Sequence, residues 1–134
     1  MGTDPTVIVA IAVTVDDIVT ALETNRRSSR QAVLRITPPF SGRTRARLHR
    51  PVADAEGAIH LDPEALVDDP PSSPTPDETA AQLRAADRYT TNRHRKRHTA
   101  AVDDWRSAVR DALVDHVVLP TSDGGHRVVV AHLG

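Results

Sequence analysis

Arginine side chains at alternate positions are the feature of this sequence best suited to chemistry. Arg43, Arg45 and Arg47 are separated by single residues, and Arg35 precedes them across a Pro-Pro-Phe-Ser-Gly segment. Residues two apart on a β-strand share a face of the sheet. The spacing predicts a hairpin over Gln31–Pro51 with one apolar face and one face of arginines. Like charges facing each other across strands are destabilising, so this face favours an anionic partner.

The turn of this hairpin is expected between Pro38 and Gly42. Prolines cannot donate ladder hydrogen bonds, and glycine tolerates positive φ. The side chains expected on the apolar face are Ala32, Leu34, Ile36, Thr44, Ala46 and Leu48.

A second basic run lies within residues 92–98. Arginine binds phosphate bidentately through its planar guanidinium, so a helix carrying this run could contact a nucleic-acid backbone. The alternatives are a solvated basic helix end and an intramolecular partner for the acidic block described below. The candidate nucleic-acid-binding residues from both regions are Arg35, Arg43, Arg45, Arg47, Arg50, Arg93, Arg95, Lys96 and Arg97.

His94 and His98 lie four residues apart, a spacing that places both on one face of a helix, as in metal-binding pairs. Arg93, Arg95 and Arg97 flank them and would repel a divalent cation. We therefore expect no metal site, and no other residues suggest a cofactor.

No catalytic motif is present. The Gly-x-Ser-x-Gly nucleophile motif and both glycine-rich nucleotide motifs are absent. Asp62, Glu64, Asp103 and Asp104 are better explained as residues that stabilise helix starts than as acid–base catalysts. The sequence predicts that the protein is not an enzyme, and no catalytic residue is assigned.

Charge is strongly segregated along the 134 residues, although the net charge is only −1. Residues 26–50 contain eight arginines and no acid, and residues 51–81 contain eight acids and no base. Such blocks form surface patches for partners or neutralise each other within the chain. If the acidic block lies across the basic face, it competes with any polyanion.

The chain has no cysteine, which excludes disulfides, zinc–thiolate sites and cysteine catalysis. Its first residues lack a basic leader region, and the apolar run over 7–13 is too short to span a membrane. We expect a cytoplasmic protein without membrane association.

The pattern of elements predicts an α+β fold, a small and mostly antiparallel sheet with helices packed on one face. We expect residues 1–68 to form a compact half, 69–76 a proline-rich linker, and 77–134 a helical half that ends in a β-hairpin, together making one domain overall. The predicted strands are 7–13, the two hairpin strands, 58–61, 117–119 and 127–133. The predicted helices are 15–25, a short one after Asp62, 76 to about 88, and 99–115.

Residues Arg35–His49, with Val13–Asp17 before them, resemble a stretch found in small uncharacterised haloarchaeal proteins. The resemblance covers about the first half of the chain. It implies a halophilic archaeal source and a compact first half, and it implies no catalytic residue.

The function predicted from the sequence is that of a non-enzymatic, nucleic-acid-associated protein. Phosphates would be bound by the arginine-rich hairpin and the basic helix. The alternative is a protein-interaction or assembly module whose basic faces pair with an acidic protein partner or with a second copy.

Overall fold

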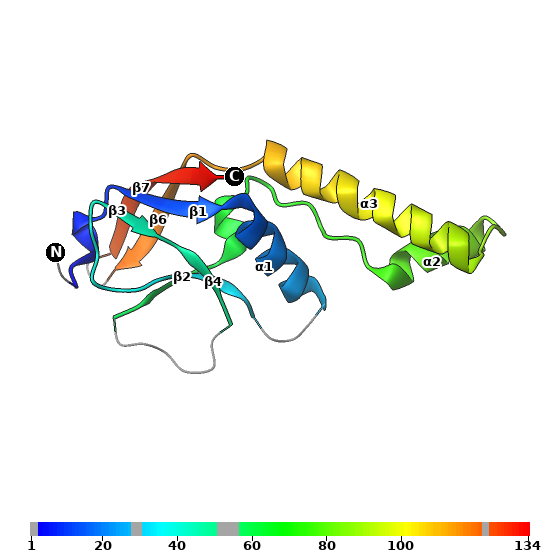
Figure 1. Cartoon of the computed structure of the whole chain (residues 1–134), viewed down its shortest axis with the longest axis horizontal. Helices are drawn as coiled ribbons and strands as arrows, with labels where there is room; N and C mark the ends of the chain where they lie inside the picture. The colour runs from blue at the N-terminus through cyan, green and yellow to red at the C-terminus, as the bar shows by residue number, and fades with distance from the viewer. Residues whose placement is uncertain (1–2, 28–30, 51–56, 122–123) are drawn as a thin grey trace.

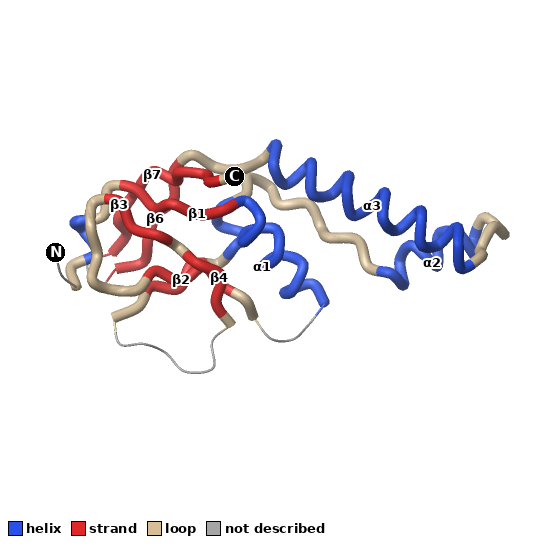
Figure 2. Tube along the Cα trace, in the orientation of Figure 1, coloured by secondary structure: helices blue, strands red, loops and turns tan. Residues whose placement is uncertain are grey.

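The computed structural model describes residues 3–27, 31–50, 57–121 and 124–134. Figures 1 and 2 show a body of strands and one helix, from which two further helices extend. The strands are β1 (Ala10–Thr14), β2 (Val33–Ile36), β3 (Arg43–Arg45), β4 (Arg47–His49), β5 (Ile59–Leu61), β6 (His116–Thr121) and β7 (Gly124–Leu133). The helices are α1 (Val15–Arg27), α2 (Pro76–Ala85) and α3 (Thr91–Asp111), with short 3₁₀ turns η1 (Pro5–Val7) and η2 (Pro63–Leu66).

The strands form two sheets. One has the order β3-β1-β7-β6 and the other the order β4-β2-β5. In the first sheet β1 pairs in parallel with both β3 and β7, and β7 pairs antiparallel with β6. In the second sheet both pairs are antiparallel. The α+β class predicted from the sequence is confirmed, and antiparallel pairs are in the majority among the described strands.

The predicted hairpin is shared between these sheets. Its first strand, β2, pairs with β4, as an antiparallel hairpin requires. Strand β3, which comes before β4 in the chain, does not pair with β2. It runs parallel to β1 at the edge of the four-stranded sheet. Ala46 lies between β3 and β4, is fully buried, and donates its N–H to the carbonyl of Ala12 at 2.9 Å. This residue is therefore the point at which the chain passes from one sheet to the other.

Helix α1 packs against β1, β2 and β4 and therefore contacts both sheets. Thr14 caps it, because its hydroxyl oxygen accepts a hydrogen bond from the Asp17 N–H at 3.1 Å. Ile18, Val19 and Ala21 are buried on its apolar face, as the spacing in the sequence predicts.

The strand predicted over 7–13 begins later, at Ala10. Asp4 accepts a hydrogen bond from the Thr6 N–H at 3.0 Å, and Pro5 has the φ that a helical first turn needs. Residues 5–7 therefore form the 3₁₀ turn η1. Val9 remains 68% exposed, so the apolar run is only partly a buried strand.

Helices α2 and α3 form an antiparallel pair, the helical arm, which extends away from the sheets (Figure 1). Thr75 and Glu78 form the capping box predicted at its start. Helix α2 ends at Ala85, earlier than predicted, because Asp87 adopts a left-handed φ of 55° and Thr90 caps a new helix. Helix α3 therefore begins at Thr91, two turns before the predicted start.

The proline-rich segment before α2 is extended, as predicted, and is fastened at two points. The Trp105 indole N–H donates to the Pro71 carbonyl at 2.9 Å, and the Arg26 Nε donates to the Ser73 carbonyl at 3.1 Å. Trp105 is itself 5% exposed and belongs to the main core. The base of the arm, the linker and the body therefore share one packed junction.

Three ion pairs between described residues also connect α1 with the arm. They are Arg26–Glu78 at 2.7 Å, Arg106–Glu23 at 2.9 Å and Arg110–Asp16 at 3.7 Å. Both partners of the Arg26 and Arg110 pairs are exposed, so these two pairs contribute little stability by themselves, whereas Glu23 in the Arg106 pair is only 16% exposed.

Candidate functional site

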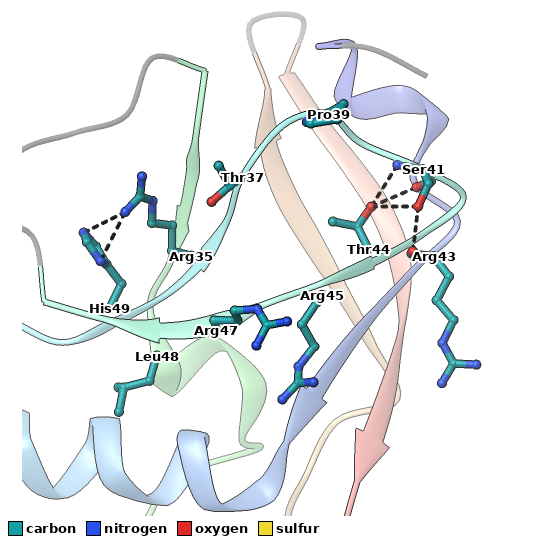
Figure 3. A pocket seen from close by; sticks show the side chains of 10 residues that line it. All are labelled: Arg35, Thr37, Pro39, Ser41, Arg43, Thr44, Arg45, Arg47, Leu48 and His49. Carbon is teal, nitrogen blue, oxygen red and sulfur yellow. Dashed lines mark hydrogen bonds between the residues drawn. The ribbon is translucent and has the colours of Figure 1, made fainter.

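Arg35, Arg43, Arg45 and Arg47 line one hollow of about 410 Å³, which we call the arginine hollow (Figure 3). Strand β2 supplies Arg35, β3 supplies Arg43 and Arg45, and β4 supplies Arg47. The remaining lining residues are Thr37, Pro39, Ser41, Thr44, Leu48 and His49. The structure thus brings together four of the nine residues predicted to bind nucleic acid.

The alternation predicted from the sequence sets this arrangement. Thr44 and Ala46 face inward and are buried, whereas Arg43 and Arg47 are exposed and Arg45 is half-buried. In Figure 3 these three arginines extend to the same side of the β3–β4 segment. The alternation of inward and outward side chains therefore continues from β3 into β4, although the two strands belong to different sheets.

The turn before β3 is held by its own hydroxyl groups and by the edge of the first sheet. The Thr44 hydroxyl accepts from the Ser41 N–H and donates to the Ser41 carbonyl, both at 3.0 Å. The Gly42 carbonyl accepts from the N–H groups of Val9 and Ala10 at 2.7 and 2.9 Å. One wall of the hollow is therefore fixed to the body.

Arg35 and Arg47 occupy directly opposite positions on β2 and β4, and His60 of β5 lies opposite Arg35 on the other side. Residues opposite one another in an antiparallel pair project from the same face of the sheet, so like charges at such positions repel. The second sheet therefore carries a row of basic side chains across all three of its strands.

The four arginines have no acidic partner within the part of the chain that the structure describes. Nη1 of Arg35 lies 3.3 Å from both ring nitrogens of His49, which places the guanidinium against the imidazole. The Nε atoms of Arg35 and Arg45 are buried and find no hydrogen-bond acceptor among the described residues. Buried donors are normally paired, so these two indicate a place for an acceptor from beyond the described residues.

Two histidines near the hollow were not singled out from the sequence. The rings of His49 and His60 lie 5.8 Å apart, although eleven residues separate them in the chain. Only the pairing of β2 with both β4 and β5 brings them together, and no local motif signals that pairing.

The other predicted basic residues lie elsewhere. Arg50 borders a separate depression with Thr20, Glu23, Thr24 and Arg27. Arg93, Arg95, Lys96 and Arg97 are exposed near the start of α3, at the far end of the arm (Figure 1). At 1.5 Å per residue, Arg95 is about 22 Å along the helix from Arg110, whose side chain meets α1. The hollow and the basic end of the arm are therefore two separate surfaces.

A family model described as a domain of unknown function, DUF8009, matches residues 1–134. The chain belongs to the DUF8009 family. No curated protein and no solved structure matches the chain. The family match includes both the hollow and the arm, so it extends well beyond the first half covered by the resemblance noted in the sequence.

In this DUF8009 chain, His94 and His98 face α2. A ring nitrogen of His94 lies 2.9 Å from the Pro76 carbonyl oxygen, and one of His98 lies 3.0 Å from the Thr79 hydroxyl. No group of three potential metal ligands occurs among the described residues. The absence of a zinc site stays a prediction, to be checked by titrating zinc against the protein and a His94→Ala, His98→Ala variant.

Two of the described acids of residues 57–81 have local roles. Asp62 accepts from the Glu64 N–H at 3.0 Å and caps η2. Hydrogen bonds from Thr75, followed by the contact with Arg26, lower the pKa of Glu78. Asp54 and Glu56 lie outside the described residues. Glu78 thus pairs with Arg26 of the basic block, whereas no ion pair between a described acid and an arginine of the hollow is seen.

Within the described ranges, no helix has the combination of length and apolar character needed to cross a bilayer.

Proposed function

We propose that this protein is a non-enzymatic, nucleic-acid-associated protein that binds phosphate groups through the arginine hollow. The observation that carries the proposal is the direct opposition of Arg35 and Arg47, in a hollow that Arg43 and Arg45 also line. This arrangement costs stability in the free protein, and an anion in the hollow would offset that cost.

The choice of arginine supports phosphate as the anion. A guanidinium presents several N–H donors in a fixed plane and binds two phosphate oxygens at once, whereas an ammonium acts as a point charge. The chain contains seventeen basic residues, and Lys96 is the only lysine. All the basic residues that line the hollow, apart from His49, are arginines.

The basic end of the arm is a second contact with the nucleic-acid backbone. Arg93, Arg95, Lys96 and Arg97 project into solvent there, while His94 and His98 on the same helix are held against α2. A long nucleic acid could contact both surfaces, whereas a short one would reach only one of them.

The aromatic residues favour recognition of the backbone over stacking on bases. Phe40 and Trp105 are buried, and Tyr89 is 39% exposed beneath the guanidinium of Arg84. Single-strand-binding platforms depend on exposed rings on which bases stack. We therefore expect strong dependence on salt and little dependence on base sequence.

A cytoplasmic role in a halophilic archaeon is part of the proposal, following the resemblance of Arg35–His49. Molar salt shortens the Debye length to about 3 Å and screens exposed charges more than enclosed ones. Under such conditions the half-buried arginines of the hollow would retain more of their attraction for phosphate than the exposed residues of the arm.

A filter-binding titration with a labelled DNA duplex over a range of salt concentrations tests the proposal. We expect binding that weakens with salt, and an Arg43→Gln, Arg47→Gln variant whose salt slope falls by about 0.9 for each lost phosphate contact. Arg127→Gln is the matched control, because Arg127 is exposed and does not line the hollow. Arg127→Gln removes one charge outside the hollow and should change the salt slope less than the loss of either Arg43 or Arg47.

A second variant tests whether the acidic block screens the arginines from the nucleic acid. It neutralises Asp68, Asp69, Asp77 and Glu78 and should bind more tightly if those acids compete with the nucleic acid. No binding at low salt by either the intact protein or this variant would overturn the proposal. The basic surfaces would then serve an acidic protein partner.

A further inference from the structure

The arginine hollow has the dimensions of a small-ligand pocket. Its volume of about 410 Å³ lies within the range of roughly 300–1,000 Å³ typical of such pockets. It is lined by residues of three strands and of the turn that contains Ser41 (Figure 3).

The hollow also concentrates more positive charge than one internal phosphodiester can neutralise. A phosphodiester carries a single negative charge, whereas a phosphate monoester carries about −1.5 to −2 at pH 7 and has three strongly accepting oxygens. Four arginines line the hollow, and Nη1 of Arg35 lies 3.3 Å from the ring nitrogens of His49. The number of donors therefore fits a monoester better than a diester.

The positions of the two buried Nε atoms that have no acceptor among the described residues also favour a monoester. The buried Nε of Arg35 belongs to the three-stranded sheet, and that of Arg45 belongs to the four-stranded sheet. In Figure 3 the head group of Arg35 lies on the His49 side of the hollow, and those of Arg45 and Arg47 lie together on the other side. A group with oxygens pointing in several directions can satisfy donors on both sides at once.

We infer that the arginine hollow binds a terminal phosphate monoester in preference to an internal phosphodiester. The inference builds on the proposed function and names the part of the nucleic acid that enters the hollow. The same chemical group occurs at the phosphorylated end of an oligonucleotide and in a free nucleoside monophosphate. The experiment distinguishes these two sources.

Fluorescence anisotropy with two single-stranded oligonucleotides of the same sequence tests the preference. One carries a 5′-phosphate and the other a 5′-hydroxyl, and both carry the dye at the 3′ end. We expect the phosphorylated form to bind about tenfold more tightly to the intact protein, which corresponds to about 1.4 kcal/mol. Arg47→Gln should lose most of this ratio.

A variant of the arm provides the matched control. Arg95→Gln, Lys96→Gln, Arg97→Gln removes three exposed charges far from the hollow. It should weaken binding of both oligonucleotides by a similar factor and leave their ratio unchanged. A ratio that falls as much in this variant as in Arg47→Gln would place the preference outside the hollow and overturn the inference.

The remaining outcomes separate the inference from the proposed function. Equal affinity for the two oligonucleotides would overturn the inference while leaving nucleic-acid binding intact. If neither oligonucleotide binds, the duplex titration decides the proposed function, and a calorimetric titration with a nucleoside 5′-monophosphate decides the inference. Stoichiometric binding that Arg47→Gln abolishes would support it with the free nucleotide as the source, and absence of binding would overturn it.

Discussion

Replacing Arg47 by glutamine should weaken anion binding and, at the same time, stabilise the free protein. Arg47 lies directly opposite Arg35, is exposed, and has no acidic partner among the described residues. The substitution therefore removes a repulsion without opening a cavity or leaving a buried donor unpaired. A residue whose role was only structural would behave in the opposite way.

The size of the gain follows from the geometry of the strand pair. Charge pairs at directly opposite positions of two strands contribute about 0.2–1 kcal/mol. We therefore expect Arg47→Gln to raise the free energy of unfolding by about 0.5 kcal/mol at low salt. In a chain of this length that corresponds to about 1–3 °C in Tm.

Urea denaturation at low and high salt is the appropriate assay, because guanidinium would itself screen the charges. The gain should be largest near 10 mM salt, where the Debye length is about 30 Å, and should largely disappear at 1 M, where it is about 3 Å. Arg127→Gln is again the control, since Arg127 lies opposite Val118 and no like charge is relieved. Its stability should change little at either salt concentration.

Two results would refute this reasoning. If Arg47→Gln lowers the stability at low salt, the side chain has a favourable contact within the chain. If stability rises but the salt slope of DNA binding stays at the value of the intact protein, the hollow is not the phosphate site.

The other predictions concern the junction between body and arm. Trp105→Ala should lower the free energy of unfolding by about 3 kcal/mol or more, because it empties a buried site; chemical denaturation measures the loss, and a water-exposed emission maximum of the intact protein would contradict it. Trp105→Phe keeps most of the packing but removes the hydrogen bond to Pro71, so we expect a loss of about 1 kcal/mol or slightly more and faster limited proteolysis of the linker. Glu78→Gln should remove a stabilisation that exists above the ordinary glutamate pKa of about 4.3 and is lost as pH falls through the lowered pKa of the folded state. Intact protein and Glu78→Gln should therefore differ in stability at pH 7, and the difference should shrink as pH falls below the ordinary glutamate pKa of about 4.3. A difference that stays constant as pH falls would contradict this origin.

Local patterns predicted the starts of α1 and α2 and the alternation of the arginine face. The capping box at Thr75 and Glu78 depends on residues three apart, and the alternation over Arg43–Arg47 depends on residues two apart. Both are properties of short segments, which the sequence displays directly.

Long-range pairing could not be predicted in the same way. Nothing near β3 indicates that it leaves its hairpin to join β1, because β-pairing is selected by the burial of partners distant in the chain. The proximity of His49 and His60 depends on that same topology. The end of α2 was missed because a single aspartate, Asp87, adopts a left-handed backbone that only a minority of aspartates adopt.

Because the chain passes from one sheet to the other at Ala46, the amide of this residue can be used to follow how the two sheets unfold. Its N–H bonds to the Ala12 carbonyl, and the residues before and after it belong to different sheets. Hydrogen exchange at this amide requires its bond to β1 of the four-stranded sheet to open, so its rate relative to the amides of β2 reports whether the two sheets unfold together or one at a time. A ligand bound in the hollow, held by arginines of both sheets, would slow that exchange in proportion to its occupancy.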